Sequence, residues 1–185
     1  MYKIGRKDRV ENLADVPQSS VGAPLPVVVS NDYKAILAYL REPVGDWDGT
    51  TVQMVGPESV EPAAIIEFKL CYVYTFGSPN DEVFDSHPLY KRGLSPYGAY
   101  EIKNSSWIRQ LERMNSVHPR HDPERFWRRH HYIFAFHDST FECVADGLRI
   151  IETSGSMKTL LPRMCEMLTE GSSGEPTREY HIGSL

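Results

Sequence analysis

The clearest alternation of apolar and polar positions lies between residues 66 and 76. Every second residue there is apolar or aromatic, and these residues are Ile66, Phe68, Leu70, Tyr72, Tyr74 and Phe76. Successive side chains of a β-strand point to opposite faces, so a period of two indicates a strand with one buried face. We therefore predict one continuous strand over 66–76, in a sheet that packs on one side.

Two shorter stretches predict β-hairpins. In residues 26–40, two apolar runs flank a Ser-Asn-Asp segment at 30–32, and such side chains favour tight turns because they bond nearby backbone groups. The second run could instead form a short helix, since it is rich in Ala and Leu. Residues 130–147 predict a second hairpin that turns at 137–140. Its expected register pairs Phe136 with Phe141, Phe134 with Cys143 and Tyr132 with Ala145.

Helical patterns occur at three places. Capping residue types at 104–106 precede an apolar stripe at helical spacing, formed by Trp107, Ile108, Leu111 and Met114. Asp122 followed by Pro123 indicates a second helix start, because Asp accepts from free amides and Pro loses no bond at the first helical position. A third helix should begin near Thr159, because Pro162 is tolerated only in a first turn. This helix should bury Leu160, Met164 and Leu168.

The predicted strands are joined more often by turns than by long helices, which favours antiparallel pairing over βαβ winding. Besides the elements above, short strands are expected over 50–55, 97–103 and 148–153. We therefore predict an α+β fold, in which a bent antiparallel β-sheet or open barrel carries two or three short helices.

The chain length of 185 residues suits one domain with a single core. Residues 1–24 show no sustained period and are interpreted as an irregular N-terminal arm. Residues 25–170 are interpreted as a single α+β domain, and residues 171–185 as a flexible C-terminal tail. Inside the domain, residues 77–96 form a long loop, and loops of this length are often functional.

Composition argues against several classes of protein. With 41% hydrophobic and 24% charged residues, the chain is too apolar for general disorder. No apolar stretch reaches the roughly 18 residues of a membrane helix, and the first residues lack the apolar part of a signal peptide. We therefore expect a soluble, cytoplasmic protein without a membrane partner. Cys71, Cys143 and Cys165 lie far apart, which predicts three small core residues rather than disulfides or a structural zinc site.

Five of the seven histidines fall within residues 118–143, where they alternate with carboxylates. Imidazole and carboxylate side chains are what a divalent metal site or an acid/base centre needs. Our metal hypothesis combines His137 and Glu142 with His118 or His87. No zinc spacing such as HExxH supports it, and no other cofactor is expected.

Sequence patterns of common catalytic and nucleotide sites do not occur. The chain has no G-x-S-x-G elbow, no Walker loop and no G-x-G-x-x-G segment. Catalytic residues are therefore left unassigned, and a non-enzymatic role is favoured.

A local excess of positive charge lies within a chain whose net charge is −5. Residues 103–131 hold seven Lys or Arg against three Asp or Glu, interleaved with aromatic residues. Arginine recognises phosphate or carboxylate in a bidentate manner, and exposed aromatic rings stack on bases. The candidate binding residues are Arg109, Arg113, Arg120, Arg128, Trp127 and, from the 77–96 loop, Tyr90. Nucleic acid is not the expected partner because the whole chain is acidic, and the arginines could instead pair with its own carboxylates.

Three function classes remain open. The leading hypothesis is a non-enzymatic binding domain that recognises a protein partner or a small ligand through the 77–96 loop and the 118–142 segment. The second is a metal-assisted or acid/base hydrolase that uses the His/Glu cluster. The third is a local phosphate or nucleic-acid binder that uses the Arg-rich 109–129 stretch. The pattern of residues does not indicate an oligomeric state.

Overall fold

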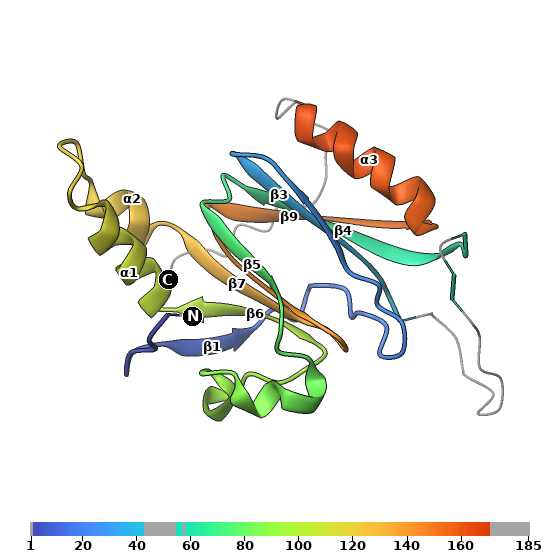
Figure 1. The fold of residues 1–185 in the computed structure, drawn as a ribbon, viewed down its shortest axis with the longest axis horizontal. Coiled ribbons are helices and arrows are strands. Elements are labelled where there is room, and N and C mark those ends of the chain that lie inside the picture. The colour runs from blue at the N-terminus through green and yellow to red at the C-terminus, as the bar shows by residue number, and fades with distance from the viewer. Residues whose placement is uncertain (1, 43–54, 57, 171–185) are drawn as a thin grey trace.

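Two antiparallel β-sheets packed face to face form the centre of the protein, seen in a computed structural model that describes residues 2–42, 55–56 and 58–170 (Figure 1). Sheet 1 consists, in spatial order, of β1 (Arg9–Asn12), β6 (Gly98–Lys103), β7 (His130–Ala135), β8 (Thr140–Ala145) and β5 (Val73–Gly77). Sheet 2 consists of β2 (Val27–Ser30), β3 (Lys34–Leu40), β4 (Glu61–Lys69) and β9 (Gly147–Gly155). The predicted α+β class is confirmed, and the described strands do not close into a barrel.

A shared corner joins the two sheets. β4 pairs with β9 in sheet 2, and the same two chain segments continue into sheet 1, where β5 pairs with β8. At the corner, the N–H of Asp146 donates to the carbonyl of Lys69 at 2.9 Å, and the N–H of Tyr72 donates to the carbonyl of Val144 at 2.8 Å. Leu70 has a positive φ of 46°, which an extended strand does not allow. The bent sheet is therefore confirmed, but the continuous strand predicted over 66–76 is wrong.

The core between the sheets is apolar and rich in aromatic rings. Sheet 2 contributes Tyr39 and Phe68, and sheet 1 contributes Phe134 and Phe141, all nearly inaccessible to solvent. The rings of Phe68 and Phe141 lie 5.0 Å apart, and those of Phe68 and Phe134 meet edge to face at 5.6 Å. Such contacts stabilise the packing of one sheet against the other beyond the area they bury.

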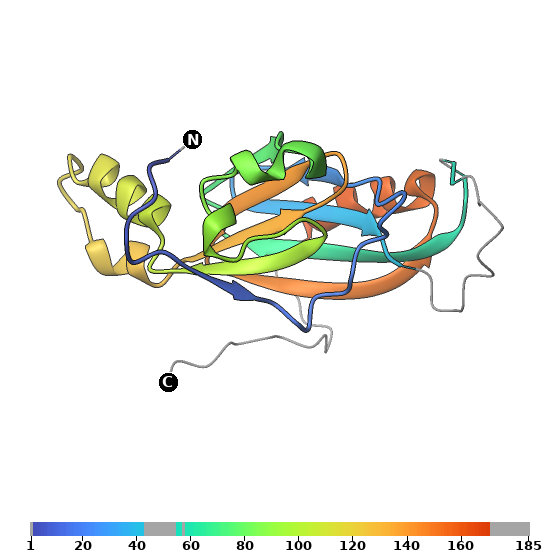
Figure 2. The same ribbon diagram turned by 90° about the horizontal axis from the view of Figure 1, so that it is seen from below.

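The outer faces of the two sheets are covered by different elements (Figures 1 and 2). α3 (Met157–Thr169) lies on sheet 2 and packs on it through apolar side chains. Two short 3₁₀ helices, η1 (Asp81–Ser86) and η2 (Tyr90–Arg92), follow β5. Phe84 of η1 and Leu89, which precedes η2, belong to the apolar cluster on the outer face of sheet 1. α1 (Ser106–Asn115) and α2 (Pro123–Trp127) lie at one end of the molecule, on the left in Figure 1.

Both predicted hairpins form, with one change of register. β2 and β3 turn at residues 31–33, so the second run is a strand and not the alternative helix. In the β7–β8 hairpin, Phe134 pairs with Phe141 and Tyr132 with Cys143, which is two residues away from the predicted register. The backbone N–H of Phe136 donates to the carbonyl of Ser139, so Phe136 faces Ser139 and the turn is two residues shorter than expected. A shift by two keeps each side chain on its face, so the aromatic face is preserved.

The three helices occur where the sequence patterns lie, but two details differ. Met114 is 65% exposed, so the stripe of α1 ends at Leu111. α3 begins at Met157, because Ser156 and Thr159 form a reciprocal capping box there. Pro162 consequently lies beyond the first turn, contrary to the prediction. In α3 the buried residues are Met157, Leu160, Met164 and Met167, whereas Leu168 is half-buried.

Other predictions from the sequence can also be compared with the structure. The segment before residue 25 is not wholly irregular, because β1 pairs with β6. Cys71 and Cys143 are buried, but Cys165 is exposed on α3, so its predicted core position is wrong. The strands predicted over 97–103 and 148–153 correspond to β6 and β9. Most of the strand predicted over 50–55, and the whole tail from residue 171, lie outside the described residues.

None of the described helices combines the length and the apolar character needed to cross a membrane.

Candidate anion-binding site

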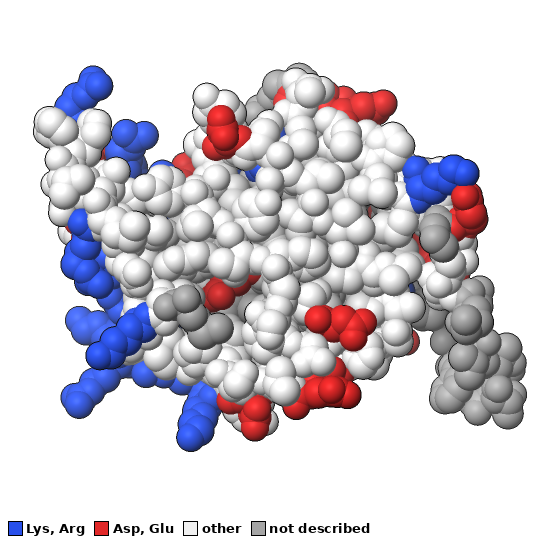
Figure 3. Space-filling model, in the orientation of Figure 1, with Lys and Arg blue, Asp and Glu red and all other residues white. Residues whose placement is uncertain are grey.

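A basic cleft of about 600 Å³ opens at the end of the molecule that carries α1 and α2. Figure 3 shows Lys and Arg side chains gathered at this end, on the left of the view, whereas most of the face is uncharged. The cleft is lined by residues from the N-terminal segment, β6, α1 and the segment that links α2 to β7. Its charged lining residues among those described are Arg6, Lys7, Lys103, Arg109, Arg128, Arg129 and Glu101.

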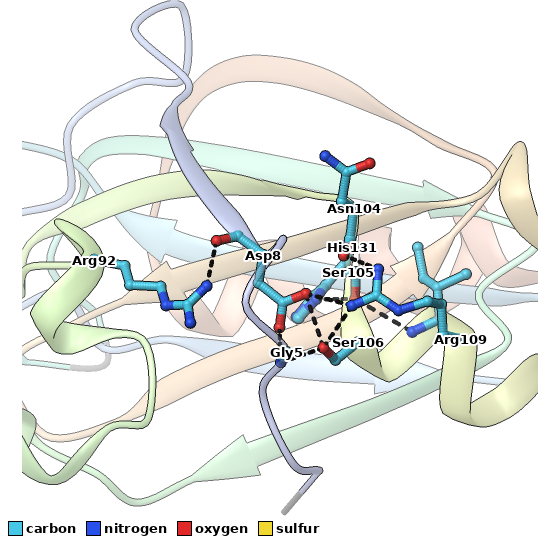
Figure 4. A network of polar contacts seen from close by, with 9 residues as sticks. Gly5, Asp8, Arg92, Asn104, Ser105, Ser106, Arg109 and His131 are labelled. Atoms are coloured by element: carbon cyan, nitrogen blue, oxygen red, sulfur yellow. Dashed lines mark hydrogen bonds and ion pairs between the residues drawn. The ribbon is translucent and has the colours of Figure 1, made fainter.

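The wall of the cleft on α1 is held in place by a buried carboxylate, that of Asp8 (Figure 4). Arg109 Nη2 donates to Asp8 Oδ1 at 2.9 Å and to Ser106 Oγ at 2.8 Å, and Nη1 donates to the carbonyl of Asn104. The side chain of Asp8 is inaccessible to solvent, whereas that of Arg109 is 36% exposed. These contacts hold the guanidinium of Arg109 in the wall of the cleft, and the carboxylate of Asp8 offsets part of its positive charge.

Gly5 completes this network by close approach of its backbone. Its N–H donates to Asp8 Oδ2 at 2.9 Å and to Ser106 Oγ at 2.5 Å. A Cβ at this position would lie 2.7 Å from Ser106 Oγ and 2.8 Å from Arg109 Nη2, so a larger residue would displace both groups. On the other side, Arg92 donates to the carbonyl of Asp8 at 2.7 Å and ties the N-terminal segment to η2.

Three of the cationic side chains that line the cleft are available for a ligand. Arg6, Lys7 and Arg128 form no side-chain hydrogen bond or ion pair with any part of the chain that the structure describes. Lys103 is instead shared between Glu101 at 2.7 Å and Glu11 at 4.0 Å. The cleft therefore combines anchored charges with free ones.

Arg129 lies at the back of the cleft with part of its guanidinium unsatisfied. Its Nε donates to Asp146 at 3.2 Å, and its guanidinium lies over the rings of Tyr72 at 4.2 Å and Phe126 at 4.8 Å. Nη1 is buried and finds no hydrogen-bond partner among the described residues. A buried donor without a partner is costly, and a ligand oxygen would satisfy it.

Glu101 supplies an acceptor beside these donors. Its Oε1 accepts from Lys103 at 2.7 Å and lies 2.8 Å from His130 Nδ1, while its buried Oε2 has no partner among the described residues. Burial alone would raise the pKa of Glu101, but the bonds with His130 and Lys103 outweigh burial, and the pKa is lowered. This side chain is therefore ionised and is a weak proton acceptor at neutral pH.

Trp127 provides an exposed ring at the rim. Asp122 caps α2 by accepting from the N–H of Glu124, and Pro123 occupies the first helical position, as predicted. This short helix turns Phe126 into the protein, where it is buried, and leaves Trp127 66% exposed. The two neighbouring aromatic residues thus have different roles, one in packing and one at the surface.

The predicted binding residues divide into two groups. Arg109, Arg128 and Trp127 line the cleft, whereas Arg113, Arg120 and Tyr90 do not. Sequence reasoning missed the contributions of Arg6 and Lys7, although the charged run at residues 6–9 was a visible signal. The sequence did not show that β1 brings this charged run beside α1.

The predicted metal residues lie in separate places. His137 contacts Asp81 at 2.8 Å, a hydrogen bond that raises the pKa of His137. His118 lies in the turn before α2, where its Nδ1 accepts from the N–H of Arg120. His87 and Glu142 do come together, with Nε2 and Oε2 4.0 Å apart. In the described ranges, no three His, Cys, Asp or Glu residues are grouped so that they could hold a metal ion.

A buried chain of polar groups runs beneath α1, away from the cleft opening. Ser105 caps α1 by accepting from the N–H of Ile108, and its hydroxyl also shares a hydrogen bond with His131 Nδ1 at 2.8 Å. His131 Nε2 then donates to Glu142 Oε1 at 2.7 Å, and the hydroxyl of Tyr2 donates to the same oxygen at 2.5 Å. Because Ser105 is buried and is also the helix cap, its hydroxyl is a structural group.

Comparison of the chain with protein-family models, with curated proteins and with solved structures finds no match.

Proposed function

We propose that this protein is a non-enzymatic binding domain whose ligand is a small phosphate-bearing molecule with a flat ring, such as a nucleotide. The observation that carries the proposal is the basic cleft itself, in which six Lys or Arg face one Glu among the described lining residues. A protein with a net charge of −5 that concentrates positive charge in one hollow attracts anions at that place.

The donors of the cleft suit phosphate oxygens. Arginine offers planar pairs of N–H groups that match phosphate in a bidentate manner, and lysine offers a point charge. Arg128 and Arg6 are free to move onto a ligand, while Arg109 is fixed by Asp8. The buried Nη1 of Arg129 is a further donor that gains a partner only if a ligand or water enters.

The remaining groups suit the other parts of a nucleotide. The exposed face of Trp127 can stack on a base, an interaction that is tolerant of base identity. The free Oε2 of Glu101 can accept from a ribose hydroxyl or an exocyclic amine. A simple inorganic anion would leave both of these groups unused.

Binding rather than catalysis is supported by the protonation states in the cleft. Glu101 is the acidic residue of the described lining, and its lowered pKa makes it a poor general base. The hydroxyl of Ser105, which also lines the cleft, is committed to His131.

Titration of the protein with ATP, AMP, pyrophosphate and a ten-residue oligo(dT), followed by Trp fluorescence and calorimetry, tests the proposal. We expect ATP to bind with an affinity that falls steeply with added salt, and Arg128→Glu to weaken it about tenfold or more. Arg113→Glu makes the same charge change outside the cleft and should have little effect. Trp127→Ala should weaken ATP and AMP but leave pyrophosphate unchanged.

The titrations also distinguish a free nucleotide from a single-stranded nucleic acid as the ligand. Oligo(dT) that binds much more tightly than ATP would identify a single-stranded nucleic acid as the ligand, since Arg128 and Arg129 also line a second hollow, of about 520 Å³. Salt-independent binding, or equal effects of Arg128→Glu and Arg113→Glu, would overturn the proposal.

A protein partner is the second candidate function, and exposed aromatic rings on β5 and directly before it favour it. Tyr72, Tyr74 and Phe76 are 44%, 39% and 43% exposed, and β5 is an edge strand of the described sheet. Edge strands pair readily with other chains, and here a second copy of β5 would supply a matching strand. Sedimentation velocity should then show dimers that Phe76→Glu abolishes and Tyr33→Glu, at an exposed turn, does not. A monomer at every protein concentration would contradict this candidate.

A further inference from the structure

A separate pocket of about 330 Å³ lies on the outer face of sheet 1 and shares no lining residue with the basic cleft. Thr75, Ser78 and Gln110 are exposed and form its rim. The walls and floor are buried side chains, namely Tyr2, Pro79, His87, Trp107, Thr140 and Glu142. The pocket is therefore open at one end and enclosed at the other.

The floor presents one free hydrogen-bond donor. His87 Nδ1 accepts from the N–H of Leu89 at 3.1 Å, so the hydrogen of the neutral ring is on Nε2. Burial lowers the pKa of His87, which keeps the ring neutral at pH 7. The His87 side chain is only 2% exposed, and its Nε2 makes no hydrogen bond to the part of the chain that the structure describes.

The floor also presents one free acceptor. Glu142 Oε1 already accepts from both Tyr2 and His131, whereas Oε2 has no hydrogen-bond donor within the described ranges. Burial alone would raise the pKa of Glu142, but the hydrogen bond from His131 outweighs it and the pKa is lowered, so the group is ionised. A carboxylate oxygen that has no donor from the protein gains from any donor that enters the pocket.

The spacing of these two atoms selects the group that can satisfy both. His87 Nε2 and Glu142 Oε2 are 4.0 Å apart, too far for a direct hydrogen bond. One oxygen atom placed between them makes two bonds of about 2.8 Å at an angle of roughly 90°. That oxygen must accept from His87 and donate to Glu142, which a hydroxyl group does.

Other charge types fit this floor poorly. An ammonium group would pair with Glu142 but has no lone pair for the N–H of His87. A carboxylate or phosphate would be repelled by the ionised Glu142. The walls add apolar surface, because the ring of Trp107 stacks on that of Tyr2 at 5.2 Å and Pro79 is buried nearby.

We propose that this pocket binds a neutral small molecule that carries a hydroxyl group on an apolar or CH-rich ring, with the hydroxyl oxygen bridging His87 and Glu142. The ring lies against Trp107 and Pro79, and Thr75 and Gln110 flank the opening. The pocket shares no lining residue with the basic cleft, and the two sites can be tested on the same protein.

A matched series of ring compounds tests the assignment. The full chain, labelled with ¹⁵N, is titrated with cyclohexanol, cyclohexyl methyl ether, cyclohexylamine and cyclohexanecarboxylate, and amide shifts are followed by NMR. We expect cyclohexanol to bind most tightly of the four, with shifts centred on residues of the pocket. The ether can accept but not donate, and we expect it to bind about tenfold more weakly.

Substitutions at the rim locate the site without disturbing the buried floor. Thr75→Phe places a large side chain in the opening and should abolish the shifts caused by cyclohexanol, whereas Ser154→Phe, at an exposed position on β9, should not. Arg128→Glu should leave cyclohexanol binding unchanged, which separates this site from the cleft. Equal binding of the amine and the alcohol, an unchanged affinity in Thr75→Phe, or no binding of cyclohexanol would each overturn the assignment.

Discussion

The outer faces of the two sheets are buried by opposite chemistry. On sheet 2, the apolar residues Ile36, Ala38 and Ile65 pack against Leu160 and Met164 of α3. On sheet 1, the buried layer includes charged and polar groups, among them Asp8, His87, Glu101, His131 and Glu142. Both layers exclude water. Among the described residues, the layer on sheet 2 buries one carboxylate, Glu67, between Lys34 and Arg149, whereas the layer on sheet 1 buries several polar and charged groups.

The difference indicates which face carries function. Apolar side chains cover most of sheet 2 beneath α3, and burying them costs little in desolvation. Burying a carboxylate carries an effective desolvation cost of several kcal/mol. Only hydrogen bonds and ion pairs inside the protein offset this cost. A face that buries several such groups, and still leaves Arg129 Nη1 and Glu101 Oε2 without partners within the described chain, has the character of a binding surface.

The largest loss of stability is expected from a substitution in the layer on sheet 2. Met164 is fully buried under α3, so Met164→Ala should lower the free energy of unfolding by about 2–5 kcal/mol through lost burial and a cavity. Urea denaturation measures the loss. The folded variant should bind ATP and cyclohexanol as the natural chain does; a loss of either affinity would show that the two faces are coupled.

A smaller effect is expected when Glu142 of sheet 1 is changed. In Glu142→Gln the amide must direct its NH₂ toward either His87 or the pair of donors from Tyr2 and His131, so we expect a loss of about 2 kcal/mol. Glu152→Gln, which breaks an exposed ion pair with Arg41 on sheet 2, should cost under about 0.5 kcal/mol. Equal costs for the two variants, by thermal or urea unfolding, would remove the contrast between the faces.

The two buried N-caps give a finer comparison. Ser156 caps α3 on sheet 2, and Ser105 caps α1 beside sheet 1 but also hydrogen-bonds to His131. Each change to Ala should cost about 1 kcal/mol for the cap, and Ser105→Ala about 1 kcal/mol more for the lost bond to His131. If Ser156→Ala proves the more destabilising variant, the polar chain beneath α1 contributes nothing to stability.

The most gradual effect is the expected decrease in folding stability as the pH is lowered. The pKa values of His87 and Glu142 are both lowered in the folded protein, so at acid pH the unfolded chain binds more protons than the native one. The contribution of these two groups to stability should therefore be full above pH 6.5, begin to fall as the pH drops below that value, and fall further below 4.5. The raised pKa of His137 has the opposite sign, so its smaller, exposed contribution is lost as the pH rises. Urea midpoints between pH 4 and 8 report this slope, and Glu142→Gln should flatten its lower part. A pH-independent midpoint would count against the neutral His87 on which the hydroxyl site depends.

The sequence alone determined the local elements of this protein. Ser and Asp before α1 and α2 marked their starts, the turn at 30–32 marked the first hairpin, and the antiparallel α+β class followed from many strands joined by turns. These features depend on backbone geometry within a few residues, which side-chain type controls directly. The patterns also located Arg109, Trp127 and Arg128, because a local excess of charge is visible in the chain.

Only the tertiary structure decided the rest. It bent the 66–76 segment at Leu70, set the register of β7 on β8, and placed Arg6 and Lys7 in the same cleft as Arg128. It also brought His87 and Glu142, 55 positions apart, to within 4.0 Å on one face. Contacts of this kind depend on which sheets pack together, and a period of two in the sequence is the same whichever sheet a strand joins.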